Sequence, residues 1–445
     1  MLISISLLHF IFVLIFILIS IKCLYKNRSL LAFVAIGFVI LDSMGLAFAP
    51  YLPLESIQYL PNPTFLITKQ NTELYMRQIL AHWIFLFVSL MGILIRLSWL
   101  KEKTVYEYSK NMNQKYLLWS LVFLFIGIVA SIKYFFIGPG LKLLITTKLS
   151  FSSTAEAIAS RSEVRDTVQF GQGAYLALLA STIIFPLSAL FYIKSKFSGG
   201  KFFVFVCFLL SFAYAFQTRQ KAPVLAVISS YLLLTMSHRQ IEKGLNLKRL
   251  KRFFILALLT GLIGGITLYK VNFGLSLSTA IISVFARLFV IPGATETNFF
   301  AVFPDYYGYR GLTKILNIPL RHANDDVSIY DVAYKAIGDY FSSNASFIAV
   351  AWSGFGYIGV MIISFLIIGV LLLLDWMLLK ANDEMLYLGV LALTFQSTLM
   401  MASGSLLSYI SHGGLIIPLL AIVIRFIVVR VKLKKVYFKG IRIGS

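Results

Sequence analysis

The sequence has little of what soluble proteins use on their surfaces and in their disulfides. Only 13% of its 445 residues are charged, and only two, Cys23 and Cys207, are cysteines. Both cysteines lie in apolar segments, so the sequence predicts neither a disulfide framework nor metal ligation by thiolates.

Several motifs of enzyme classes are also missing. The chain has no nucleotide-binding loop, no HExxH motif, no CxxC pair, no GxSxG elbow and no internal repeat. These absences disfavour ATP-driven and metal-hydrolytic activities. We therefore expect no cofactor and no metal ion.

What the chain has in abundance is apolar surface. It is 59% hydrophobic, with a mean hydropathy of +0.85. Apolar runs of about 18 residues or more, each long enough to cross a hydrocarbon core of ~30 Å, recur along its length. The sequence predicts an all-α polytopic membrane protein, a single membrane domain over residues 1–445 with about eleven transmembrane helices. The predicted spans are residues 3–22, 30–50, 78–99, 117–137, 173–193, 201–217, 222–237, 253–274, 357–379, 385–402 and 413–430.

The basic residues predict the orientation of these spans. Lys and Arg gather in every second junction and in the tail after the last span, which marks that side as cytoplasmic. We expect a bacterial inner-membrane protein with a periplasmic N-terminus and a cytoplasmic C-terminus. The first segment lacks a basic start and a cleavage site, so we expect it to be a retained helix. This distribution also accounts for the net charge of +22 without a nucleic-acid partner.

The predicted outer face carries the longer segments. Residues 139–172 are a predicted periplasmic loop, and residues 275–356 are a second, large and late one. Function tends to reside in elaborated loops, so we expect the chemistry at the periplasmic face.

Several basic residues lie on the predicted outer face, where the positive-inside rule makes them uncommon. Arg219 and Lys221 lie where one predicted span ends and the next begins, and a helix N-terminus beside two cations suits an anion. Arg287 lies among apolar residues, where a bare cation costs about 3 kcal/mol or more unless it meets an anion or water. Arg161 and Arg165 are four apart and share one face of a predicted helix. Each of these cations also has an explanation that involves no ligand. Arg219 and Lys221 would be side chains that snorkel to the membrane boundary, and Arg287 would pair with an internal carboxylate. Arg161 and Arg165 would lie on a solvated amphipathic helix.

Aromatic residues and two further stretches complete the candidates. Residues 298–326 hold six Phe and Tyr residues close to Arg310, Arg321 and His322. Aromatic rings stack on the C–H faces of sugars, but they also gather at membrane interfaces. The stretch NASFIAVAWSGFGYIGV, residues 344–360, places three glycines at the mouth of a predicted span, where they suit either close packing or a site.

The order of these stretches resembles the Wzy-type oligosaccharide repeat-unit polymerases of O-antigen and related surface polysaccharides. The likeness is carried by the Asn344 stretch, by Arg161, Arg165 and the following Gly171-Gln172-Gly173, and by the Arg219 turn. Related O-antigen ligases often have a histidine where Asn344 stands, so no histidine base is carried over to that position.

The resemblance implies a glycosyltransferase that moves a growing glycan from undecaprenyl pyrophosphate to an incoming lipid-linked repeat unit. It assigns Arg219, Lys221 and Arg287 to the diphosphate, Arg161 and Arg165 to the second lipid-linked substrate, and Asn344, Tyr340 and Trp352 to the sugars. The general base stays unassigned, with His322 and Asp339 as options. The implied partners are membrane lipids, a chain-length regulator and a flippase. A flippase or exporter, an O-antigen ligase and a non-catalytic assembly partner are the alternatives.

Overall fold

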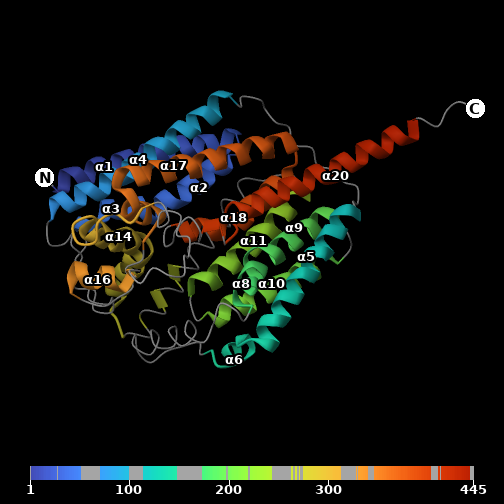
Figure 1. The fold of residues 1–445 in the computed structure, drawn as a ribbon, viewed down its shortest axis with the longest axis horizontal. Helices are drawn as coiled ribbons and strands as arrows, with labels where there is room; N and C mark the ends of the chain where they lie inside the picture. The colour runs from blue at the N-terminus through green and yellow to red at the C-terminus, as the bar shows by residue number, and fades with distance from the viewer. Residues whose placement is uncertain are drawn as a thin grey trace, which may run out of the picture. The chain divides into compact units, whose positions relative to one another are not determined.

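The fold of this chain is described from a computed structural model (Figure 1). The structure describes residues 2–27, 29–51, 71–99, 114–147, 173–196, 199–218, 221–242, 262–263, 266–267, 270, 274–311, 327, 329–338, 345–401, 409–410 and 412–440. Over these residues the regular structure is helical and no strand is present, which confirms the predicted all-α class.

The chain divides into two compact units. The first comprises residues 1–102, 246–373 and 398–409, and the second comprises residues 103–245, 374–397 and 410–445. Each unit is therefore built from segments that are far apart in the sequence.

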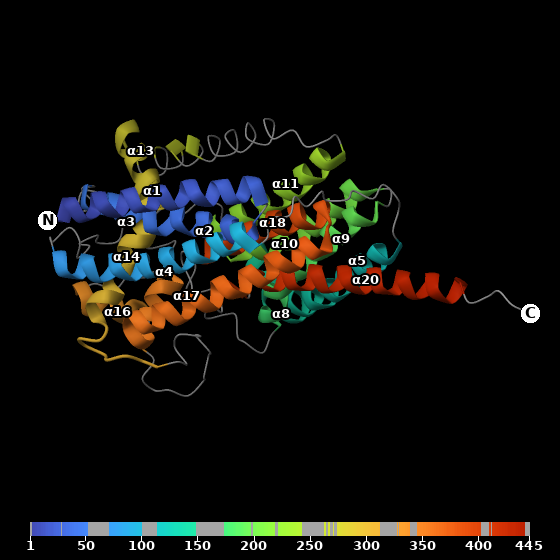
Figure 2. The ribbon, with the colours of Figure 1, turned by 90° about the horizontal axis from the view of Figure 1, so that it is seen from above.

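The first unit is built on long helices at its N-terminal end and on shorter, broken ones from the late segment. Helices α1, α2 and α4 run side by side, and α14 packs against both α3 and α4 (Figures 1 and 2). The elements are α1 (Leu2–Asn27), α2 (Leu30–Phe38), η1 (Val39–Ser43), α3 (Met44–Phe48), η2 (Ala49–Tyr51), α4 (Thr72–Trp99), α13 (Leu277–Phe285), η6 (Ala286–Val290), α14 (Ile291–Val302), α16 (Ile329–Ile337) and α17 (Phe347–Ala381) as far as residue 373.

Glycines let the η6–α14 segment lie very close to the η1–α3 segment. A Cβ atom on Gly45 would lie 1.8 Å from the backbone oxygen of Phe289, and one on Gly293 would lie 2.8 Å from that of Asp42. Neither position has room for a side chain. This contact brings the polar groups of η1 and α14 together in the interior.

The second unit joins its helices through small polar residues. Ser120 of α5 and Ser188 of α9 each donate a hydrogen bond of 2.8 Å to the other's backbone oxygen. Ser181 of η5 and Ser211 of α10 form the same reciprocal pair at 3.0 Å. Such exchanges satisfy hydroxyls between apolar helices. The elements are α5 (Gln114–Ile132), η4 (Lys133–Ile137), α6 (Gly140–Ile145), α8 (Ala174–Leu179), η5 (Ala180–Ile184), α9 (Phe185–Ser195), α10 (Gly200–Gln217), α11 (Lys221–Glu242), α17 from residue 374, α18 (Glu384–Met401) as far as residue 397, and α20 (Ile416–Gly440).

The helices agree closely with the predicted spans. Among the described residues, seven helices are long and apolar enough to cross a membrane, and three shorter apolar helices fall within residues 226–238, 384–395 and 416–429. Together these coincide with ten of the eleven predicted spans. The remaining one, 253–274, lies mostly outside the described residues. The chain is therefore a multi-pass membrane protein, while the count of eleven and the orientation stay predictions.

Two predicted boundaries differ from the structure. The span predicted at 357–379 belongs to α17, which begins at Phe347 and breaks at Phe355 and Gly356. The predicted loop 275–356 contains α13, η6, α14 and α16. These short helices include Pro292 and several polar residues, so they lack the long apolar run by which the spans were recognised.

Candidate functional site

A break in α17 lies beside a cavity in the first unit. Phe355 (φ −147°, ψ 27°) and Gly356 (φ 59°, ψ −139°) leave helical geometry, and the helix resumes after them. The carbonyls of Ser353 and Gly354 would normally accept bonds from residues beyond this break. Instead they accept bonds of 2.9 and 3.1 Å from the backbone N–H groups of Arg310 and Gly311. The loop after α14 is thereby held against the broken helix.

Gly356 is required at this break for two reasons. Its positive φ is a conformation that side-chain-bearing residues rarely adopt. In addition, a Cβ atom there would lie 2.6 Å from the hydroxyl oxygen of Tyr309 and 2.9 Å from its ring carbon Cζ. The glycine therefore lets Tyr309 lie directly on the backbone of α17.

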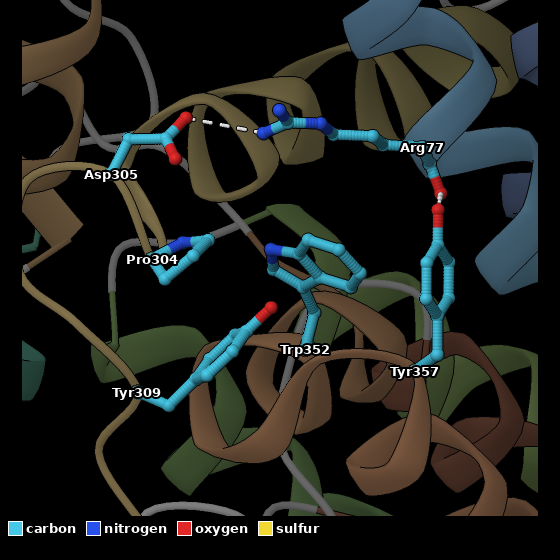
Figure 3. Close-up of a pocket in the computed structure, with 6 residues that line it drawn as sticks. All are labelled: Arg77, Pro304, Asp305, Tyr309, Trp352 and Tyr357. Atoms are coloured by element: carbon cyan, nitrogen blue, oxygen red, sulfur yellow. Dashed lines mark hydrogen bonds and ion pairs between the residues drawn. The ribbon is translucent and has the colours of Figure 1, made fainter.

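A cavity of about 260 Å³ lies beside this contact (Figure 3). Its lining residues come from three parts of the first unit. They are Arg77 of α4, the loop residues Pro304, Asp305 and Tyr309 that follow α14, and Trp352 and Tyr357 of α17. This volume lies slightly below the range of ligand pockets, which begins at about 300 Å³.

The aromatic wall of the cavity is fixed by hydrogen bonds and ring contacts. Trp352 is 3% exposed, and its Nε1 donates a bond of 2.9 Å to the backbone oxygen of Phe303. Its ring centroid lies 4.8 Å from that of Tyr357 and 6.1 Å from that of Tyr309, both edge to face. Tyr309 is 46% exposed, so one ring of the set is open to a ligand.

The polar side of the cavity is an ion pair. Arg77 Nη1 lies 3.1 Å from Asp305 Oδ2, and Nη2 lies 2.7 Å from Glu73 Oε1. Half of the Asp305 side chain is exposed, which leaves its carboxylate accessible from the cavity. The ion pair with Arg77 orients this carboxylate.

The Tyr309 hydroxyl adds a hydrogen-bond donor. Partial burial raises its pKa above the ordinary value, the Arg77 charge opposes this shift, and the Asp305 charge adds to it. The hydroxyl therefore stays protonated at neutral pH. Aromatic rings, a carboxylate, a guanidinium and a phenol together form a set that binds hydroxyl-rich, partly apolar ligands such as sugars.

Two of the predicted site residues come together here. Trp352 lines the cavity, and Arg310 lies at its edge, where its backbone contacts α17 and its guanidinium carbon lies 5.8 Å from the Phe303 ring centroid. Arg310 Nη1 also donates a bond of 3.4 Å to the backbone oxygen of Val327.

Arg287 lies elsewhere, on η6 between α13 and α14. Its side chain is exposed and does not line the cavity, and it forms no ion pair with any residue that the structure describes. The alternative of an internal carboxylate partner therefore receives no support from the described part of the chain.

The other predicted residues are not described by the structure. Lys221 begins α11, but its side chain is not described. The residues outside the described ranges are Arg161, Arg165, Arg219, Arg321, His322, Asp339, Tyr340 and Asn344.

The ends of the Arg219 turn border a second cavity. This cavity, of about 190 Å³, belongs to the second unit. Thr218 and Pro223, which flank the turn, line it together with Tyr214 and His412. The cavity has hydroxyl and imidazole groups close to the turn where the sequence predicts an anion site.

The ion pair between Arg77 and Asp305 was not predicted from the sequence. Arg77 and Asp305 are 228 positions apart, so no local pattern connects them. The signal available was the i,i+4 spacing of Glu73 and Arg77, which marks an ordered helix start at the edge of a span.

The comparisons with known proteins give no match: no protein-family model, no curated protein and no solved structure is significantly similar to this chain. The fold alone therefore defines the class, an all-α multi-pass membrane protein with an aromatic, ion-paired cavity in its first unit.

Proposed function

We propose that this chain is a Wzy-type glycosyltransferase that polymerises undecaprenyl-pyrophosphate-linked oligosaccharide repeat units at the periplasmic face of the bacterial inner membrane. The observation that carries the proposal is the cavity in which Trp352, Tyr309 and Tyr357 surround the Arg77–Asp305 pair. It lies in the two stretches that the sequence favours for sugar contacts, residues 298–326 and 344–360.

The proposed reaction joins two lipid-linked glycans. A hydroxyl of the incoming repeat unit loses its proton to Asp305, and its oxygen attacks the anomeric carbon of the growing glycan. The bond from that carbon to the lipid diphosphate breaks, and undecaprenyl pyrophosphate leaves as the anion.

Within this reaction the described residues have distinct tasks. Tyr309 and Tyr357 offer ring faces to the acceptor sugar, and Trp352 holds them in place. Asp305 is the general base, because its carboxylate is half exposed and lines the cavity beside the aromatic rings. It takes the role for which the sequence offered His322 and Asp339.

The diphosphate is assigned to Arg219, Lys221 and Arg287. Developing negative charge on a leaving group is stabilised by preorganised cations. Arg161 and Arg165 are assigned to the second lipid-linked substrate.

The test is a reconstituted reaction. Purified protein in liposomes is incubated with a synthetic lipid-pyrophosphate repeat unit, and the products are resolved by size. A ladder of products spaced by one repeat unit is the expected result. A single addition that requires a lipid A core acceptor would replace the proposal by a ligase, and translocation without new bonds would replace it by a flippase.

A further inference from the structure

A second group of chemically active side chains lies in the interior of the first unit, separate from the cavity. Asp42 of η1, His82 of α4 and Glu296 of α14 place one ligand atom each within 4.8 Å of the others. All three side chains are fully buried, with 0% of their surface exposed. Element η1, which carries Asp42, is π-helical, a distortion that often occurs at functional sites.

His82 is oriented as metal-binding histidines are. Its Nδ1 lies 2.8 Å from the Ser43 hydroxyl oxygen, and its Nε2 lies 3.1 Å from Glu296 Oε2. In the tautomer in which Nδ1–H donates to Ser43, the lone pair of Nε2 faces the Glu296 carboxylate, an arrangement that a metal cation between the two atoms would stabilise. In the other tautomer, the Ser43 hydroxyl donates to Nδ1 and Nε2–H donates to Glu296.

Glu296 is held by its own partners. Its Oε1 accepts a bond of 2.9 Å from the backbone N–H of Ser346, which leaves Oε2 directed at His82. Gln78 Nε2 lies 3.4 Å from Oε2, and Gln78 is in turn fixed by a bond of 2.7 Å from the Thr297 hydroxyl. The carboxylate is therefore preorganised by groups around it.

Asp42 is the member that points to a missing ligand. Both of its carboxylate oxygens are buried, and neither meets hydrogen-bond geometry with any residue that the structure describes, although the side chains of Glu296 and Ser346 lie beside them. A buried carboxylate without a partner is strongly unfavourable, most of all beside a second carboxylate in a membrane protein.

We propose that Asp42, His82 and Glu296 bind a divalent transition-metal ion, with Zn²⁺ as the first candidate. Two positive charges balance the two carboxylates, and one nitrogen with two oxygens is a donor set that such ions accept. In a tetrahedral zinc site, with bonds of about 2.0–2.2 Å, ligand atoms lie roughly 3.3 Å apart, close to the 3.1 Å between Nε2 and Oε2.

This site differs from the sequence-based expectation that the chain holds no metal. The three ligands are separated by 40 and 214 positions in the sequence, so no local sequence motif identifies them as a metal site. The close approach of α14 to η1, which Gly45 and Gly293 permit, brings them together.

The experiment measures bound metal in full-length protein. The chain is purified through a tag without histidines in chelator-treated buffers, and its metals are quantified by mass spectrometry. Unfolding temperature is measured with and without a strong chelator, and with Zn²⁺, Mn²⁺ or Fe²⁺ added back. Asp42→Asn and Glu296→Gln remove ligands, and Asp375→Asn, which changes another buried carboxylate, is the matched control.

We expect about one ion per wild-type chain. Most of it should be lost in Asp42→Asn and Glu296→Gln and kept in Asp375→Asn, and chelation should lower the unfolding temperature of the wild type by several degrees. The proposal is overturned if the wild type carries no transition metal and responds neither to chelator nor to added ions. Asp42 would then hold a proton, and Asp42→Asn would be as stable as the wild type. Equal metal content in the wild type and Asp42→Asn would overturn it as well.

Discussion

Gly356 is the residue on which the geometry of the cavity depends most directly. Its left-handed conformation ends the first part of α17, and its missing side chain admits the Tyr309 hydroxyl. The loop and the broken helix would separate if this position carried a Cβ atom, because the contacting atoms are those of a ring fixed beside Trp352.

We therefore expect Gly356→Ala to lower stability by about 1–3 kcal/mol, the usual range for overpacking and backbone strain. The measurement is thermal unfolding in detergent, followed by the polymerisation assay on the surviving folded protein. Gly369→Ala is the matched control, since a Cβ atom there meets no atom within 4 Å in the same helix. Equal stability of the two variants would contradict the role assigned to Gly356.

The cations assigned to the diphosphate give a second prediction at this scale. Replacing Arg219 or Arg287 with Ala should lower polymerisation by about 100-fold or more, while insertion into the membrane is unchanged. Lys201→Ala, on the predicted cytoplasmic side, should keep full activity. Full activity in both arginine variants would refute the predicted anion site.

At the scale of elements, one ion cluster joins three helices of the second unit. Asp383 lies at the start of α18, where its Oδ1 accepts a bond of 3.0 Å from the Leu386 N–H. Its Oδ2 pairs with Lys194 of α9 and lies 3.3 Å from Arg425 Nε of α20. Asp383 is therefore both a helix cap and the shared anion of two cations.

Asp383→Asn keeps the capping oxygen but removes the charge. Breaking a buried ion pair by removing one partner costs about 3–5 kcal/mol, so the unfolding midpoint should fall clearly. The measurement is again thermal unfolding in detergent. Glu73→Gln, which removes an exposed partner of Arg77, is expected to cost less than about 1 kcal/mol. If both variants lost a similar amount of stability, burial would not strengthen the ion pairs of Asp383.

The elements also show what the sequence could and could not predict. Long apolar runs such as residues 3–22 were recognised because lipid requires them, and the helices coincide with them. The first part of α17 was missed because Gly354 and Gly356 are typical of loops, whereas the chain is helical up to the break. Trp352 was a candidate from its stretch, but Asp42 and Asp305 meet their partners only through the tertiary fold.

At the scale of the whole molecule, the orientation in the membrane rests on the distribution of basic residues. Cys23 and Cys207 are both buried, so a variant with Ala at both positions is a suitable background. A cysteine introduced at Gln220 should react with a membrane-impermeant maleimide in intact spheroplasts, and one at Gly444 should react only after lysis. Labelling of Gly444→Cys but not Gln220→Cys in intact cells would invert the topology and remove the diphosphate site from the outer face.

The sharpest test of the proposed active site compares the polymerisation rates of two variants, each of which removes one carboxylate partner of Arg77. Asp305 and Glu73 both pair with Arg77, but only Asp305 lines the cavity. In liposomes with the lipid-pyrophosphate repeat unit, Asp305→Asn should extend the product ladder about 100-fold or more slowly than the wild type, as expected for a lost general base. Glu73→Gln should keep close to the wild-type rate. A full ladder from Asp305→Asn, at the same rate as from Glu73→Gln, would contradict the assignment of the reaction to this cavity.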